Sequence, residues 1–113
     1  MATLTTQTIT RAGVDPSLAA AAGGGDSFTP GDDVFLHVAN GGGGSITVTI
    51  AGQGTIVPNM DVPDVVVSVT NGQDRMIGPF PFTLFADPSD GLADITYSGV
   101  TSVTVGAFRL QRP

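Results

Sequence analysis

Short runs in which apolar and polar residues alternate make up most of this chain. Residues 34–39 place a branched apolar side chain at every second position, and residues 46–50 repeat the pattern with threonines in between. Such an alternation predicts a β-strand with one buried face and one exposed face. Residues 40–44, an asparagine and four glycines, tolerate a tight reversal. We therefore expect a hairpin whose flexible, exposed glycine tip is a candidate contact site.

The alternation continues in the middle of the chain. After a loop at residues 58–63, residues 65–69 form a third run of this kind, with valine at positions 65, 67 and 69. Asn71-Gly72 is a turn signal and comes before a short segment, Arg75-Met76-Ile77. Both runs are expected to be strands.

Two prolines end this short strand. Pro79 and Pro81 cannot donate hydrogen bonds to a strand ladder, so we expect the segment around them to cross from one sheet to another. Residues 83–86, which precede an Asp-Pro pair, fit a single helical or 3₁₀ turn.

The last part of the chain contains two further strands, at residues 93–97 and 103–110. In the second of them the pattern changes phase, because Val105 and Phe108 lie on opposite parities. A β-bulge near Gly106 would direct both side chains into one core. A strand that crosses the edge of a sandwich is the alternative.

The first residues have a weaker pattern. Residues 3–9 combine β-propensity with polarity, so residues 1–12 are expected to form either an edge strand or an arm laid on a partner by strand addition. Residues 17–23 fit one helical turn that ends at glycines. The candidate partner contacts in the first segment are Leu4, Thr6, Ile9 and Arg11.

Composition supports an all-β fold. The chain of 113 residues has 16 glycines, many valines and threonines, and neither lysine nor glutamate. Branched residues favour sheets, and 41% hydrophobic residues suffice for one modest core. We therefore expect residues 1–113 to form a single antiparallel β-sandwich domain of about seven or eight strands, with jelly-roll or immunoglobulin-like connections.

The charge distribution narrows the range of partners. Ten aspartates against four scattered arginines give a net charge of −6, which disfavours nucleic acid and anionic membranes as partners. There is no cysteine, so a disulfide framework and a thiolate metal site are excluded. The N-terminus lacks the features of a Sec-type export signal, and no stretch approaches the roughly 18 apolar residues of a membrane span.

His37 is the sole histidine and the natural candidate for a general base. It lies out of phase with the core residues of its run, and the chain has no Gly-x-Ser-x-Gly elbow. We therefore expect a histidine on a strand face or at an interface and no catalytic residue.

Three carboxylates, those of Asp87, Asp90 and Asp94, surround a glycine turn and are candidate ligands for a hard cation. The segment lacks the regular ligand spacing and the closing Glu of a calcium loop, and Asp-Pro and Asp-Gly are ordinary turn formers. A solvated turn is the favoured interpretation. The glycines at residues 40–45 lead into a strand instead of a helix N-terminus, which argues against a phosphate site, and no cofactor is expected.

Three phenylalanines, Phe80, Phe82 and Phe85, lie close together among prolines. Burial at one end of the core is the favoured interpretation. The alternative is an exposed apolar patch for docking or oligomerisation, with Phe80 and Phe82 as candidate partner contacts.

Several segments resemble small structural proteins of tailed bacteriophages that are encoded near the major capsid protein and decorate the head. The resemblance is one of texture and order, spans most of the chain, and rests on residues 35–42 (FLHVANGG), 74–81 (DRMIGPFP), 84–87 (LFAD), 95–98 (ITYS) and 103–105 (VTV). It implies a virion protein made in the host cytoplasm that binds the major capsid protein on the outer surface of the head and stabilises the capsid. It also implies a homo-oligomer, with a trimer favoured.

Two other function classes compete with this expectation. A tail, fibre or adhesin module that binds carbohydrate or a host surface would be expected to expose aromatic residues, yet the chain has one tyrosine and no tryptophan. An enzyme is the weakest class, because a chain without Cys, Glu and Lys has few groups for acid, base or nucleophilic catalysis.

Overall fold

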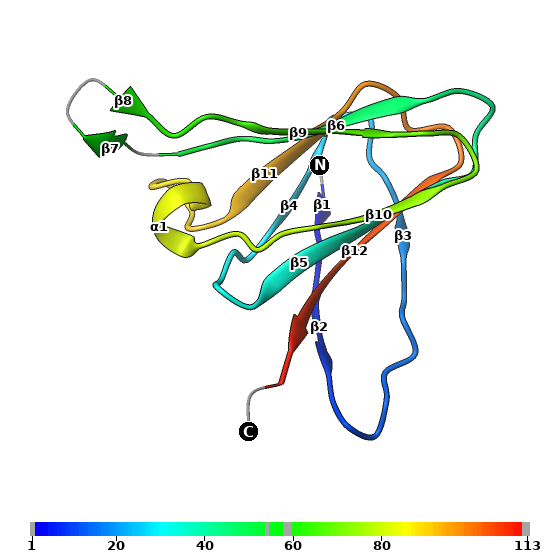
Figure 1. Ribbon diagram of the computed structural model, residues 1–113, viewed down its shortest axis with the longest axis horizontal. Helices are drawn as coiled ribbons and strands as arrows, with labels where there is room; N and C mark the ends of the chain where they lie inside the picture. The colour runs from blue at the N-terminus through cyan, green and yellow to red at the C-terminus, as the bar shows by residue number, and fades with distance from the viewer. Residues whose placement is uncertain (1, 54, 58–59, 112–113) are drawn as a thin grey trace.

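The computed structural model describes residues 2–53, 55–57 and 60–111, and this part of the chain forms two β-sheets that pack face to face (Figure 1). The first sheet has the strand order β1 (Ala2–Thr3), β4 (Asp26–Phe28), β11 (Ala93–Tyr97), β6 (Ile46–Ile50) and β9 (Val65–Val69). The second has the order β10 (Asp74–Ile77), β5 (Val34–Asn40), β12 (Val103–Leu110) and β2 (Thr6–Ile9), and β3 (Ala19–Ala20) also pairs with β12. A separate two-stranded ribbon consists of β7 (Thr55–Val57) and β8 (Met60–Asp61).

The expectation of an all-β sandwich is confirmed. The strands outnumber the expected seven or eight because short pairings such as β1, β3, β7 and β8 leave little trace in the hydrophobic pattern. The loop expected at residues 58–63 includes residues 58 and 59, which lie outside the described residues.

The alternating runs bury the side chains that the pattern predicts. Burial alternates strictly along β5 and along β6, with the branched apolar residues inside. The expected hairpin between these strands is wrong, because β5 belongs to the second sheet and β6 to the first. Two strands with the same alternation can share a core by facing each other across a sandwich as well as by pairing, so residues 41–45 cross between the layers.

The glycine-rich crossing is tied down by one buried side chain. The Asn40 amide nitrogen donates to the carbonyl oxygens of Gly44 and Val69 at 2.9 and 3.0 Å, and its oxygen accepts from the Gly42 N–H at 3.0 Å. Asn40 is 2% exposed. The glycine segment, which was expected to be a flexible tip, is therefore connected through Asn40 to the end of β9.

The crossing predicted at the prolines is confirmed. The chain leaves β10 in the second sheet, passes Pro79 and Pro81, forms the single turn α1 (Phe82–Phe85), and enters β11 in the first sheet. The helical turn begins one residue before the expected range of 83–86.

The bulge expected at Gly106 is wrong. β12 pairs with β5 in unbroken register from Val103 opposite Asn40 to Arg109 opposite Val34. Ala107 fills the inward position, and Phe108 points out of the other face of the sheet. A Cβ on Gly106 would lie 2.8 Å from Cδ2 of Leu18, so glycine lets the chain near Leu18 lie flat on this outer face.

The first residues form edge strands on the protein's own sheets. β1 pairs with β4 and β2 pairs with β12, both in parallel, so the sandwich is not purely antiparallel. Two adjacent parallel strands need a long connection between them, and the strands of both pairs, β1 with β4 and β2 with β12, are far apart in sequence. The helical turn expected at 17–23 is wrong, since β3 pairs with β12 and the Ala21 N–H donates to the Val103 oxygen at 3.0 Å. A single turn is too short to be stable alone, whereas β12 offers backbone partners.

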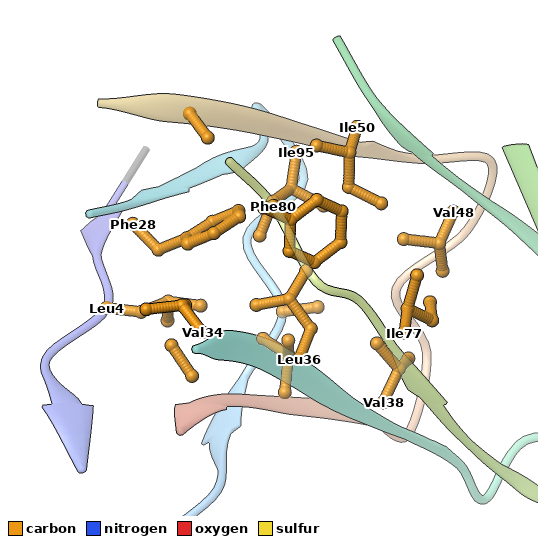
Figure 2. Packing of buried hydrophobic residues seen from close by; sticks show 14 of the residues in the cluster. Leu4, Phe28, Val34, Leu36, Val38, Val48, Ile50, Ile77, Phe80 and Ile95 are labelled. Atoms are coloured by element: carbon orange, nitrogen blue, oxygen red, sulfur yellow. The ribbon is translucent and has the colours of Figure 1, made fainter. Parts of the chain in front are cut away.

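Both sheets contribute to the core. Side chains from β5 and β6, together with Ile95, point into the space between the layers (Figure 2). Phe80 lies within this core, with its ring 5.2 Å from that of Phe28 and 5.3 Å from that of Phe85 in edge-on geometry (Figure 2). The favoured interpretation of burial in the core is therefore confirmed for Phe80 and Phe85 and is wrong for Phe82, which is exposed on α1.

Candidate functional site

The outer face of the second sheet carries an unusual number of apolar side chains. The strand registers place Met76 beside His37, and Leu110 beside Ile9. Outward positions of a sandwich sheet are normally polar, so a cluster of this kind marks a candidate binding surface. The outward apolar side chains from these strands are those of Ile9, Phe35, Met76, Phe108 and Leu110.

A groove of about 330 Å³ lies on this face. Its floor is aromatic, because the rings of Phe35 and Phe108 stack with centroids 5.9 Å apart. The loop after β2 forms part of its lining. We call this feature the outer groove, and it is lined by Ile9, Val14, Pro16, Phe35, His37, Met76 and Phe108.

The loop that lines the outer groove is held by one glutamine. The Gln7 side chain donates to the Ser17 carbonyl oxygen at 2.7 Å and accepts from the Ser17 N–H at 2.9 Å. This paired contact joins β2 to the end of the loop, so the groove has a defined wall.

Large apolar side chains on this face remain open to solvent. Met76 is 66% exposed and Leu110 is 56% exposed, and Val14 lies at the margin with 36%. Each leaves apolar surface in water that association with another protein would remove.

His37 lies in the groove and bonds to Asp74. The His37 Nε2 and Asp74 Oδ2 atoms are 2.9 Å apart, and the Asp74 side chain is 57% exposed. The His37 ring is also 6.4 Å from that of Phe108. Among the described residues the hydrogen-bond partner of the His37 ring is Asp74 and no serine or threonine hydroxyl. The pair supplies a polar margin to an apolar groove.

The candidate contacts in the N-terminal segment are divided among different surroundings. Leu4 is 8% exposed and its N–H donates to the Ser27 oxygen at 2.7 Å, so its expected role as a partner contact is wrong: it bridges the two sheets in the core. Thr6 lines a second hollow of about 520 Å³, together with Arg109, whose Nε is 3.5 Å from Asp33 Oδ2. Ile9 lines the outer groove, and Arg11 is exposed in the turn that follows.

The two candidate contacts near the prolines, Phe80 and Phe82, differ in their exposure to solvent. Phe80 is 1% exposed, which removes it from any contact surface of the folded chain. Phe82 is 54% exposed and lines a third hollow of about 460 Å³ beside α1, with Thr83, Ala86 and Pro88 among its neighbours. The structure therefore does not gather the predicted contacts into one site.

The aspartates predicted as weak metal candidates are used locally. Asp87 Oδ1 accepts from the N–H and hydroxyl of Ser89 at 2.9 and 2.8 Å, and these bonds lower the pKa of Asp87. Asp90 Oδ1 accepts from the Leu92 N–H at 2.9 Å. Partial burial, and then the charges of Asp90 and Asp87, raise the pKa of Asp94. Within the described ranges no three acidic or imidazole groups are arranged to hold a metal ion.

Sequence reasoning missed most of the outer groove. The pattern does not single out Val14, Pro16 or Met76, and it assigns Phe108 to the core. The available signal was the parity of Phe35 and His37, which shows an aromatic pair on the face opposite the core.

Comparisons of the chain with protein-family models, with curated proteins and with solved structures gave no match. In the described part of the chain no helix has the length and apolarity needed to cross a membrane. The expectation of a phage virion protein thus rests on the sequence resemblance, and the expectation of a binding role on the residues of the outer face.

Proposed function

We propose that this chain is a non-enzymatic structural protein of a tailed-bacteriophage virion, which attaches to the outer surface of the head by binding the major capsid protein. The observation that supports attachment is the outer groove, an apolar depression with exposed Met76 at its margin on a face formed by regular strands. The choice of the capsid as partner is supported by the resemblance of the sequence to head-decoration proteins.

The chemistry of the groove favours binding over catalysis. Six of its seven lining residues are apolar or aromatic, and the polar one, His37, is engaged with Asp74. Binding surfaces combine an apolar centre with a few polar groups at the margin, and the groove has this composition.

The size of the effect follows from the exposed side chains. Full burial of a methionine contributes about 1.5–3 kcal/mol. Since Met76 is 66% exposed, covering it would add about 1–2 kcal/mol, or roughly 5- to 30-fold in affinity.

The test is co-sedimentation of the purified chain with shells of the major capsid protein encoded in the same genome. We expect saturable binding in a fixed ratio to capsid subunits. The Met76→Asp variant should lose more than about tenfold in affinity, because it removes the apolar contact and places a second carboxylate next to Asp74 in the interface. Thr96→Asp, which adds the same charge on the outer face of the first sheet, is the matched control and should bind like the native chain.

Two results would contradict the proposal. One is a native chain that stays in the supernatant at every shell concentration. The other is equal binding by the native chain and Met76→Asp, which would place the contact elsewhere.

A further inference from the structure

The edge strand β9 differs from the other sheet edges in this protein. It contains four valines and a serine, with no charge, proline or bulge, and it pairs along its whole length with β6. Exposed edges are normally protected by charges or short strands. β10 carries Asp74 and Arg75, β1 has two residues, and β2 has four, three of them polar, whereas β9 has five residues, four of them valine.

The direction of its backbone groups follows from the neighbouring strand. The Thr47 N–H donates to Ser98 Oγ at 2.8 Å, and the Thr47 oxygen accepts from the Ser98 N–H at 2.9 Å. Both backbone groups of Thr47 therefore point to the β11 side and away from its β9 partner, Ser68. In an antiparallel ladder the two groups of a residue point the same way and alternate along the strand.

It follows that Val66 and Ser68 direct their N–H and C=O groups outward, away from β6. No described strand pairs with β9 on that side, which is the border of the first sheet (Figure 1). Val66 is also 62% exposed, an unusual state for a valine in a strand. The edge thus offers two donors and two acceptors, spaced for an added strand, beside an uncovered apolar side chain.

We propose that β9 pairs with β9 of a second copy of this chain, antiparallel about a two-fold axis at Val67. In this register Val66 faces Ser68 of the other copy, so the four outward groups of each strand complete four backbone hydrogen bonds. The pairing is self-complementary, as a two-fold interface requires.

Charge supports a second copy as the occupant. The chain has a net charge of −6, so most approaches between two copies bring carboxylates together. The two β9 strands that would meet at this edge carry no charged residue. The nearest, Asp64, would lie opposite Thr70 and is already bonded through Oδ1 to the Gly52 N–H at 2.9 Å. A two-fold pairing closes with two copies and is therefore distinct from the trimer that the resemblance implies.

The test measures the mass of the isolated chain in solution by sedimentation equilibrium, with no capsid present, so its result is independent of the proposed attachment to heads. We expect a dimer of the native chain. Val66→Lys, which places a charge at the edge, should raise the dimer dissociation constant at least tenfold. Thr96→Lys adds the same residue to the same outer face at the central strand β11, and should leave the dimer intact.

A second variant tests the backbone contribution. Ser68→Pro removes an N–H that points outward and is not used in the ladder with β6, so it deletes two of the four new hydrogen bonds and should also give monomers. Thermal unfolding of each variant checks that it is folded. A native chain that is monomeric at high concentration overturns the proposal, as does a trimer or dimer that survives both Val66→Lys and Ser68→Pro.

Discussion

The hydroxyl of Tyr97 stabilises a carboxylate that has no contact with solvent. Tyr97 Oη donates to Asp26 Oδ2 at 2.8 Å, and the same oxygen accepts from the Ala22 N–H at 3.2 Å. Asp26 is 0% exposed. Burial, followed by the contact with Asp26, raises the pKa of Tyr97, so the phenol stays protonated and remains a donor at neutral pH. We predict that Tyr97→Phe destabilises the fold.

The expected loss of stability follows from this geometry. Phenylalanine keeps the ring, so the change in packing is small and the main loss is one hydrogen bond to a charged group. Such bonds contribute about 1.5–3 kcal/mol, and Asp26 keeps the Ala22 N–H as a donor. We therefore expect the free energy of unfolding to fall by about 2 kcal/mol.

The assay is equilibrium unfolding in urea. With a slope of about 2 kcal/mol per molar for a domain of this size, the loss corresponds to a midpoint lower by about 1 M. In an Asp26→Asn background, Tyr97→Phe should lower the free energy of unfolding by less than half as much. The side chain at position 26 is then a neutral amide, so the lost hydrogen bond no longer stabilises a charge. An unchanged midpoint for Tyr97→Phe, or an equal effect in both backgrounds, would contradict the stabilising role of the Tyr97–Asp26 hydrogen bond.

Three further substitutions test the fold by unfolding measurements. Phe80→Ala should cost about 3–5 kcal/mol because the ring is buried, whereas Phe82→Ala, at a side chain 54% exposed, should cost below about 1 kcal/mol; equal losses would contradict the different burial of the two rings. Gly25→Ala should cost at least about 2 kcal/mol, because Gly25 has φ +97° and a Cβ there would lie 2.6 Å from the Ile95 oxygen, while Gly43→Ala meets nothing within 4 Å and should be nearly neutral. The pKa of Asp94 is raised above 3.8 in the fold, so its ionisation opposes folding and the penalty grows as the pH rises through the folded pKa. Asp94→Asn should therefore raise the melting temperature at neutral pH and lose this advantage below about pH 3, and a constant difference at both pH values would argue against the assigned cause.

The alternating pattern predicts the longer strands and, for β5 and β6, the side that faces the core. This was possible because the period of two is local: the inward positions of β5 and β6 can be recognised without knowing their partners. The partners could not be derived in the same way. Residues 34–39 and 46–50 read as a hairpin because nothing in a short run says whether its apolar face meets a neighbour beside it or a sheet opposite it.

The candidate site was harder to predict because it depends on contacts between distant segments. Phe108 is out of phase with the inward residues of β12. If Phe108 belonged to the same core as Val105, the strand would need a bulge between them. The structure shows instead that the outer face has an apolar cover of its own, in which Leu18 packs close to Gly106 and the loop with Val14 lines the outer groove. Leu4 was misplaced for a similar reason, since its polar neighbours hide the fact that it bridges two sheets.

Residue-level imaging of intact particles would show whether many copies of this chain attach to the head of a virion. We expect density for the sandwich at regular capsid symmetry positions, in many copies per particle. The outer face of the second sheet, around Met76, should lie against the major capsid protein. Density in a few copies at the tail would favour a tail or fibre module, and particles that lack the chain altogether would contradict the proposed function.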